Sequence, residues 1–329
     1  MPLTPAQLAA RAKGIGGSDA GAIIGVSPWA SAFDVFARLR PDVIPCESPR
    51  VESEASEWGT ILEAPIADVY REREHAAGSC IELAEVTMTL RHPGREWMLA
   101  HPDRLISGGG KPPGVLEVKT AGIRQAHRWG EEDSGEIPEE YRCQVAHYMA
   151  VTDLPRADVA VLLGGQELRV YRLVRDPELE ELLIEALEDF WTKHVQPGIP
   201  PPIGESPRAA EWIGRMHPRN VAGMRQATPA EASLALDYAR AREAAKETDA
   251  EKEAARVAIC AAIGDAEGLW WGDDPKRPSK ATWKNNRDGA RTDWEALAKS
   301  LNPPESLIAQ YTHTTPGARV LRVAAKEQT

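Results

Sequence analysis

The sequence predicts an α/β domain followed by a region with a long helix and a small β unit. Helical and strand patterns alternate through the first 200 residues. The proline-rich stretch PGIPPPIGESP, at residues 197–207, then interrupts the pattern, because proline fits neither a helix interior nor a central strand. Residues 230–263 contain no glycine or proline and are rich in Ala, Glu, Lys and Arg, which indicates one long helix or a helical hairpin. We therefore expect domains at residues 1–200 and 208–329.

Helices open the first domain. Thr4-Pro5 has the N-cap and N1 pattern that begins a short helix. The run GIGGSDAGAIIGVSPW predicts a glycine-rich turn in which Ser18 or Asp19 caps the helix AGAII, and Ser31 then caps AFDVFARL. The run EWGTILEAPIADVYRERE repeats apolar residues at helical spacing and predicts the next helix.

Apolar runs then predict three strands, a helix, a strand pair joined by a tight Gly-Gly turn, and a final helix. In chain order these are strands at Leu83–Leu90, Glu96–Ile106 and Gly114–Thr120, the helix PEEYRCQVAHYMAVT, the hairpin strands ADVAVLLGG and QELRVYRLV around Gly164-Gly165, and a helix at Glu178–Lys193.

The composition excludes some classes of protein. No apolar run reaches the roughly 18 residues that span a bilayer, and the N-terminus lacks a signal-peptide core, so we expect a cytoplasmic protein with no membrane partner. The 4 cysteines are scattered singly, which argues against a zinc ribbon or an iron–sulfur cluster. The net charge of −11 is uneven: residues 1–205 have 20 Lys and Arg against 33 Asp and Glu, and residues 206–329 have 19 against 17. This balance argues against nonspecific coating of DNA, although a bound cation can reverse the field locally.

Charged residues interrupt the most apolar strand pair. Glu117 and Lys119 are two residues apart on one strand and therefore share a face. Asp103 lies at the end of the preceding strand, and a loop through three glycines would bring it alongside. Paired carboxylates repel unless a cation neutralises them, and hard oxygen ligands suit Mg²⁺, with Mn²⁺ able to substitute. The carbonyl of Val118 faces the same region and can add a ligand. The alternative is an exposed ion pair on the wet face of a strand.

The same residues carry a resemblance to a known family. HPD…LEVK resembles the PD-(D/E)xK nuclease signature, and the runs GIGGSDAGAIIGVSPW, WGTILEAPIADVY and YRCQVAHYMAVT resemble motifs of YqaJ-type phage recombinases, relatives of the lambda phage exonuclease. The resemblance covers about residues 11–195. It implies a restriction-endonuclease-like core: a mixed sheet flanked by helices. It also implies metal-dependent digestion of double-stranded DNA from the 5′ end, which leaves a 3′ overhang for an annealing protein, and a ring-shaped homotrimer.

The resemblance also assigns roles to individual residues. It makes Asp103 and Glu117 metal ligands, Lys119 the catalytic lysine, Glu63 an additional acidic group near a metal, and Gln144 a residue near the scissile bond. Without it, Glu63 would be read as a solvated helix residue and Gln144 as a polar surface position.

The glycine-rich turn is a candidate phosphate site. The helix that begins at Ser18 offers its N-terminus to an anion, and the resemblance places an arginine, Arg11, at the same DNA phosphate. Trp29 is expected in the core, and Tyr141 and Tyr148 are expected to serve packing. His101 departs from the family pattern, which has a small hydroxyl residue there.

The C-terminal region offers weaker signals. Its long helix is expected to serve self-packing or assembly. Between Lys276 and Arg291, six basic residues surround Trp283, a composition that suits a nucleic-acid strand or an exposed solubilising loop. Two alternatives to the exonuclease stay open: an endonuclease or repair nuclease on the same core, and a non-catalytic scaffold that binds DNA ends.

Overall fold

The computed structural model describes residues 5–44, 53–204, 208–217, 219–220, 222–272, 279–285, 293–301 and 303–312. The chain divides into two compact units, Met1–His217 and Pro218–Thr329. Within the described ranges, no helix is both long and apolar enough to cross a membrane.

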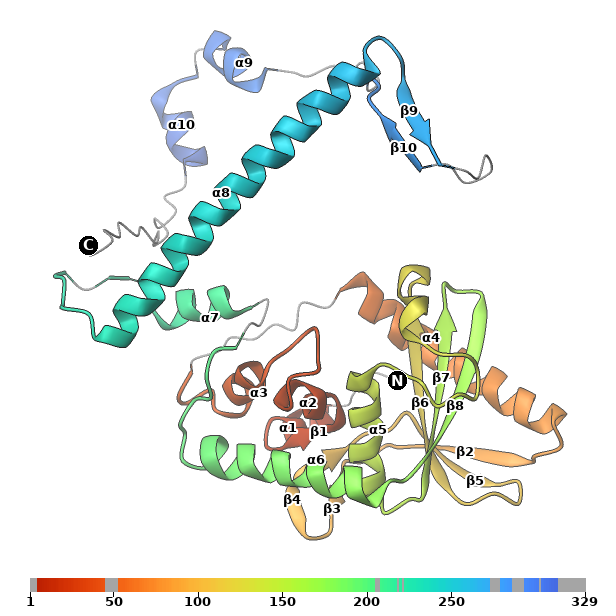
Figure 1. The fold of residues 1–329 in the computed structure, drawn as a ribbon. Coiled ribbons are helices and arrows are strands. Elements are labelled where there is room, and N and C mark those ends of the chain that lie inside the picture. The colour runs from red at the N-terminus through yellow and green to blue at the C-terminus, as the bar shows by residue number, and fades with distance from the viewer. Residues whose placement is uncertain are drawn as a thin grey trace. The chain divides into compact units, whose positions relative to one another are not determined.

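A five-stranded mixed sheet forms the centre of the first unit (Figure 1). All neighbouring pairs are antiparallel except β6 and β7, whose parallel pairing requires a crossover, and helix α5 (Glu139–Thr152) supplies it. The sheet order is β2 (Ile81–Glu85), β5 (Arg104–Gly108), β6 (Gly114–Ala121), β7 (Arg156–Leu163) and β8 (Glu167–Val174). A second, smaller sheet consists of β1 (Ile15–Gly16), β4 (Arg95–Ala100) and β3 (Leu90–His92).

The sheet separates two hydrophobic cores because successive side chains of a strand point to opposite faces. Val115 belongs to the core beneath α5, whereas Leu116 and Val118 belong to the core beneath α4 (Glu54–Ala76). The α5 core is the larger one and includes residues of several further helices. These are α2 (Gly17–Ile23), α3 (Ala32–Leu39) and α6 (Pro177–Phe190), which continues into a π-helical turn at Trp191–Val195. The remaining helices of this unit are α1 (Pro5–Arg11), a 3₁₀ helix at Ile123–Arg128 and α7 (Ala209–Met216).

The α/β class, a mixed sheet flanked by helices, is confirmed, and so are most elements. Ser31 caps α3, the Gly164-Gly165 turn joins β7 and β8, and Asp19 accepts a hydrogen bond from the backbone N–H of Gly16 at 2.8 Å at the start of α2. Thr4 lies outside the described residues.

Two of the expected long strands are wrong. Glu96–Ile106 is two strands in different sheets, because Pro102 lacks a backbone N–H and the chain turns at His101–Asp103. Leu83–Leu90 is likewise divided between β2 and β3. As a result, Asp103 immediately precedes β5 instead of ending a strand.

The first unit extends beyond the expected boundary. Helix α7 follows the proline-rich stretch, and its Trp212 is 2% exposed within the larger core. The indole N–H of Trp212 donates to Asp34 Oδ1 at 2.7 Å, and the ring packs 6.0 Å from Phe33. The compact unit therefore ends at His217, and the separate folding of residues 1–200 and 208–329 stays a prediction.

The second unit contains one long helix and a hairpin. Helix α8 (Pro229–Ile263) is continuous, and Thr228 and Glu231 form a capping box at its start. The hairpin pairs β9 (Gly268–Trp271) with β10 (Ser279–Thr282), and two short helices follow, α9 (Trp294–Ser300) and α10 (Glu305–Tyr311). The run ARVLRV, which together with Trp270-Trp271 and ATWKNN predicts the small β unit, lies outside the described residues.

Candidate active site

The candidate site forms where β6 loses its antiparallel partner. The β5–β6 pairing ends at Arg104 opposite Leu116, so the next residues of β6 have no strand on that side. Asp103 takes the place of the missing strand, because its Oδ2 accepts a hydrogen bond from the backbone N–H of Val118 at 2.7 Å. The break at Pro102 thus positions a carboxylate beside Glu117.

Glu117 is the centre of a buried hydrogen-bond network. Its side chain faces α5, and Oε1 accepts from Lys119 Nζ at 2.5 Å and from Gln144 Nε2 at 2.6 Å. The same amide nitrogen of Gln144 lies 3.0 Å from the hydroxyl of Tyr148. Glu117 is only 3% exposed, and its second oxygen, Oε2, is buried with no hydrogen-bond partner among the described residues.

The charges in this network oppose one another. Burial and the nearby Glu117 carboxylate raise the pKa of Asp103 well above its usual value. Burial likewise raises the pKa of Glu117, although the Lys119 ammonium opposes that rise. Burial disfavours the Lys119 ammonium, but Glu117 and Asp103 outweigh it and raise the lysine pKa. The site therefore holds two carboxylates that need a cation and one lysine that keeps its proton.

Glu63 reaches the site from α4 but is already engaged. Arg104, which is 7% exposed, donates to Glu63 Oε1 at 2.8 Å and also to the backbone carbonyl of Asp103. Glu63 still contributes to raising the pKa values of Asp103 and Glu117, so it lies within electrostatic range of both carboxylates.

The donor set fits a hard divalent cation. Within the described ranges, no three His, Cys, Asp or Glu side chains form a ready metal cage. Mg²⁺ does not require one, because it commonly binds through one or two carboxylates and keeps several waters. The buried, unpartnered Oε2 of Glu117 is the observation that points to a cation, since a carboxylate oxygen buried without a partner is costly. Asp103 and Glu117 are the residues that would hold it.

The structure also brings together the two residues expected at a DNA phosphate. Arg11 donates from its guanidinium to Ser18 Oγ. Asp19 stabilises the position of the Arg11 guanidinium, because the Asp19 carboxylate forms an ion pair with Arg38 at 2.7 Å and lies 4.0 Å from Arg11. The N-terminus of α2 therefore presents a hydroxyl and a guanidinium side by side.

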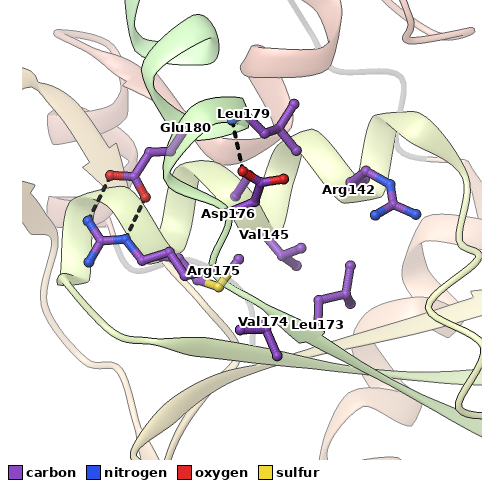
Figure 2. A pocket seen from close by; sticks show the side chains of 10 residues that line it. Arg142, Val145, Leu173, Val174, Arg175, Asp176, Leu179 and Glu180 are labelled. Atoms are coloured by element: carbon purple, nitrogen blue, oxygen red, sulfur yellow. Dashed lines mark hydrogen bonds and ion pairs between the residues drawn. The ribbon is translucent and has the colours of Figure 1, made fainter.

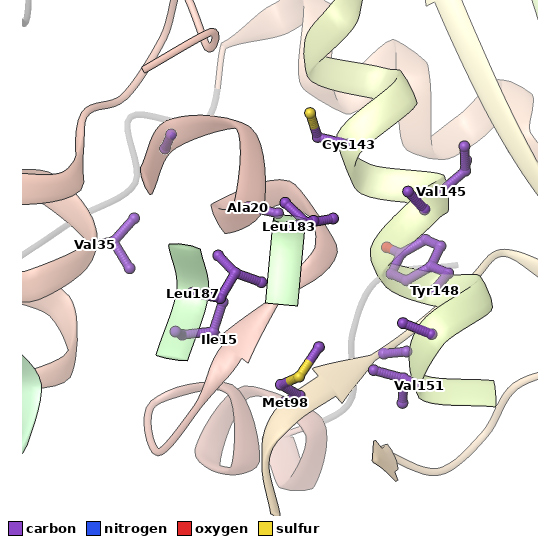
Figure 3. Packing of buried hydrophobic residues seen from close by; sticks show 14 of the residues in the cluster. Ile15, Ala20, Val35, Met98, Cys143, Val145, Tyr148, Val151, Leu183 and Leu187 are labelled. Atoms are coloured by element: carbon purple, nitrogen blue, oxygen red, sulfur yellow. The ribbon is translucent and has the colours of Figure 1, made fainter. Parts of the chain in front are cut away.

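Sequence reasoning missed three residues that shape these groups. Arg104 could have been noticed as a charge that shares the inward face of β5 with Ile106. Tyr148 points from α5 into the larger core (Figure 3), and its spacing of four residues from Gln144 on the predicted helix is the signal that its hydroxyl could meet that amide. Arg38 has no signal beyond its place in the last turn of α3.

One sequence prediction about this region is wrong. Trp29, expected in the core, is 52% exposed, because the loop that carries it leaves the end of α2 at the surface. Tyr141 packs as expected, but its ring also lies 5.0 Å from Lys119 Nζ, which is cation–π distance.

A separate cavity of about 110 Å³ lies between α5, the end of β8 and α6 (Figure 2). Its charged lining residues already have partners: Arg175 forms a bidentate ion pair with Glu180, Asp176 caps α6, and Arg142 donates to the Gly135 carbonyl. The cavity contains none of the expected site residues.

The basic segment of the second unit is only partly described. Lys276, Arg277, Arg287, Asp288 and Arg291 lie outside the described residues. The side chains of Lys280, Trp283 and Lys284 are exposed at the hairpin, and Lys284 pairs with Glu267.

The fold and site define an α/β domain with a buried carboxylate–lysine centre at an open strand edge. Comparison with known proteins finds similarity to one family. Residues 7–155 match the model of the YqaJ-like viral recombinase domain. A curated relative, the uncharacterized protein YqaJ of Bacillus subtilis (strain 168), is 34% identical over 209 residues, which is 63% of this chain and 61% of the relative. The chain thus matches about three-fifths of that protein's length. Both matches support the resemblance to YqaJ-type recombinases that the sequence motifs indicate.

Solved structures show weaker likenesses. An alkaline exonuclease, LHK-Exo, from Laribacter hongkongensis aligns with a TM-score of 0.46 and 19% identity, over 58% of this chain and 92% of that one. A phage-related exonuclease from Haemophilus somnus 129PT aligns with a TM-score of 0.39 and 14% identity, over 55% and 94%.

Proposed function

We propose that this protein is a metal-dependent nuclease that hydrolyses phosphodiester bonds at the ends of linear double-stranded DNA. The observation that supports the proposal best is the buried Oε2 of Glu117, which has no hydrogen-bond partner among the described residues and belongs to a carboxylate close to Asp103 and the Lys119 ammonium. The match of residues 7–155 to the YqaJ-like viral recombinase domain agrees with this reaction class.

Each residue has a role in the proposed hydrolysis. Asp103, Glu117 and the Val118 carbonyl would hold Mg²⁺, or Mn²⁺ in its place, with Glu63 nearby; the bound ion lowers the pKa of a water and offsets charge on the phosphate. Lys119 donates hydrogen bonds to the phosphate and stabilises the charge that develops as the water oxygen attacks phosphorus and a P–O bond breaks. Gln144 holds the Glu117 carboxylate through its amide.

We further propose that digestion runs 5′ to 3′ and leaves 3′ single strands for phage-type recombination with an annealing protein. Arg11 and Ser18 would bind the terminal 5′ phosphate, since a guanidinium and a hydroxyl at a helix N-terminus suit an anion. A homo-oligomer, a ring trimer by family resemblance, would keep the enzyme on its substrate. The C-terminal region that the sequence predicts from residue 208 onward would then serve assembly, DNA binding or partner docking.

The test uses linear duplex DNA labelled separately at its two 5′ ends and its two 3′ ends, incubated with Mg²⁺, with Mn²⁺ and with EDTA. We expect early release of 5′ label as mononucleotides, dependence on the cation, and no digestion of closed circular DNA. Cleavage of closed circles would indicate an endonuclease. Binding to ends without cleavage under any cation would indicate the scaffold alternative.

A further inference from the structure

The exposed ring of Trp29 sits on a fixed piece of backbone. After α2 the chain reverses at Gly25, whose φ of +84° suits glycine, and the N–H groups of Val26 and Ser27 both donate to the Gly21 carbonyl, at 2.9 and 3.0 Å. The Trp29 N–H donates to Ser27 Oγ at 3.3 Å. The loop is therefore held by hydrogen bonds while Trp29 remains 52% exposed.

Trp29 is the outer member of an aromatic group that ends at the catalytic lysine. Its ring centroid lies 5.9 Å from that of Tyr141, at an interplanar angle of 35°. Tyr141 is held from behind by the buried Trp129, stacked at 5.4 Å and 25°, and its ring lies 5.0 Å from Lys119 Nζ. One aromatic ring thus separates the exposed indole from the ammonium of the site.

Helix α2 connects this aromatic group to the expected phosphate site. It runs beside α5 so closely that a Cβ at Gly17 would lie 2.5 Å from the Tyr148 ring, and one at Gly21 would lie 3.2 Å from the Glu140 backbone (Figure 1). Ser18 is in the first turn of α2, and Trp29 lies shortly after its end. The Arg11–Ser18 pair and Trp29 therefore lie at opposite ends of one short helix, which packs against the same α5 that carries Gln144 and Tyr141 to the Glu117–Lys119 pair.

We propose that Trp29 stacks on the nucleobase adjacent to the phosphodiester that is cut. This inference rests on the proposed function, because Lys119 marks the reacting phosphate. An indole face is chemically suited to any base, since every base has a π face, and stacking of this kind tolerates sequence. The cations Lys119 and Arg11 suit a phosphate-bearing occupant rather than an apolar peptide. Trp29 therefore holds the terminal nucleotide unpaired while the phosphodiester on its 3′ side lies at Lys119 and its 5′ phosphate lies at Arg11 and Ser18.

The first arm of the test is a cycle that combines a protein change with a substrate change. Trp29→Ala is compared with wild type in single-turnover digestion of a duplex that carries all its bases and of duplexes with one abasic nucleotide at each of the first three positions. We expect Trp29→Ala to slow digestion of the complete duplex about 10-fold. At one of the three positions, the abasic nucleotide should slow digestion by wild type to a similar extent. On that abasic duplex, Trp29→Ala should be little slower than wild type. Trp29→Phe should retain most of the rate, whereas Trp29→Leu should behave like Trp29→Ala.

The second arm measures binding without cleavage. A duplex with 2-aminopurine as the terminal base is titrated with protein in EDTA, and stacking is read as fluorescence quenching. Wild type and Trp29→Phe should quench, and Trp29→Ala should bind with clearly less quenching. Thermal unfolding of each variant confirms that it is folded, since a side chain this exposed contributes little to the core.

The outcomes separate this inference from the proposed function. Three results would overturn the stacking role while leaving the nuclease intact. They are rate losses from Trp29→Ala and from the abasic nucleotide that multiply at all three positions, equal quenching by wild type and Trp29→Ala, and a wild-type rate in Trp29→Leu. Trp29-dependent quenching without cleavage would leave the stacking role in place and remove the nuclease. A wild-type protein that neither binds nor cuts the duplex would remove both.

Discussion

Trp212 anchors the end of the first unit, and replacing it should destabilise that unit strongly. The indole is 2% exposed, packs on Phe33, and donates to Asp34 Oδ1 at 2.7 Å. Truncating a buried tryptophan to alanine costs about 3–5 kcal/mol. The lost hydrogen bond to the Asp34 carboxylate accounts for part of that cost or adds to it, because hydrogen bonds to charged groups contribute about 1.5–3 kcal/mol. Against a total stability of about 5–15 kcal/mol, the loss should be large.

The measurement is urea unfolding of a chain ending at His217, followed by far-UV circular dichroism. With a urea m-value of about 2–3 kcal/mol/M, Trp212→Ala should lower the midpoint by about 1–2 M. Trp212→Phe should lower it less, because a ring remains in the core. Ile213→Ala is the matched control, since Ile213 is the next residue of α7 but is 48% exposed. If the alanine variants at 212 and 213 had equal midpoints, α7 would not be anchored as described. A chain ending at Pro207 should resemble Trp212→Ala, because it lacks the whole helix.

Three further predictions concern the α2–α5 region. Arg11→Ala should reduce the preference for 5′-phosphorylated over 5′-hydroxyl ends, measured as the ratio of initial digestion rates; an unchanged ratio would make Arg11 ordinary surface charge. His147 is buried, its Nε2 donates to the Leu99 carbonyl at 3.0 Å, and burial lowers its pKa to about 4. Between pH 6.5 and 4 the unfolded chain therefore binds a proton that the folded chain does not, so the free energy of unfolding should decrease as the pH is lowered, by at most about 1.4 kcal/mol per pH unit. The His147→Gln variant, measured by chemical denaturation, should lack that part of the pH dependence. Gly17→Ala should lower the thermal midpoint more than Gly122→Ala does, because a Cβ at Gly17 would meet the Tyr148 ring at 2.5 Å, whereas Gly122 has a φ of −65° and no described atom lies within 4 Å of its Cβ position; if Gly17→Ala is the milder change, the close packing of α2 on α5 is refuted.

The sequence predicted the centre of the site well, because strand periodicity is a local property. Glu117 and Lys119 were expected on one face, and the structure joins them at 2.5 Å. Helix caps and the Gly164-Gly165 hairpin were also predictable, since their residues contact only near neighbours in the chain. The roles of Glu63 and Gln144 came from the family resemblance. These roles stay predictions, and so do the metal-binding and catalytic roles of Asp103, Glu117 and Lys119.

Long-range contacts could not be predicted in the same way. Arg104 holds Glu63 from 41 positions along the chain, and Trp212 meets Asp34 from 178 positions away. Nothing in the local sequence encodes either pairing. Trp29 shows the opposite error: hydrophobicity favoured the core, but the loop geometry after α2 leaves the ring half exposed.

The most direct test of the catalytic centre is the cleavage rate of Asp103→Asn. Asparagine keeps an oxygen that can accept from the Val118 N–H, but it removes one of the two carboxylate charges that a cation would neutralise. In saturating Mg²⁺, with linear duplex as substrate, we expect the rate to fall by about 10²–10³-fold or more. The thermal midpoint measured in EDTA should be at least that of wild type, because the repulsion between the Asp103 and Glu117 carboxylates is removed. A folded Asp103→Asn protein that cleaves at the wild-type rate would contradict the account.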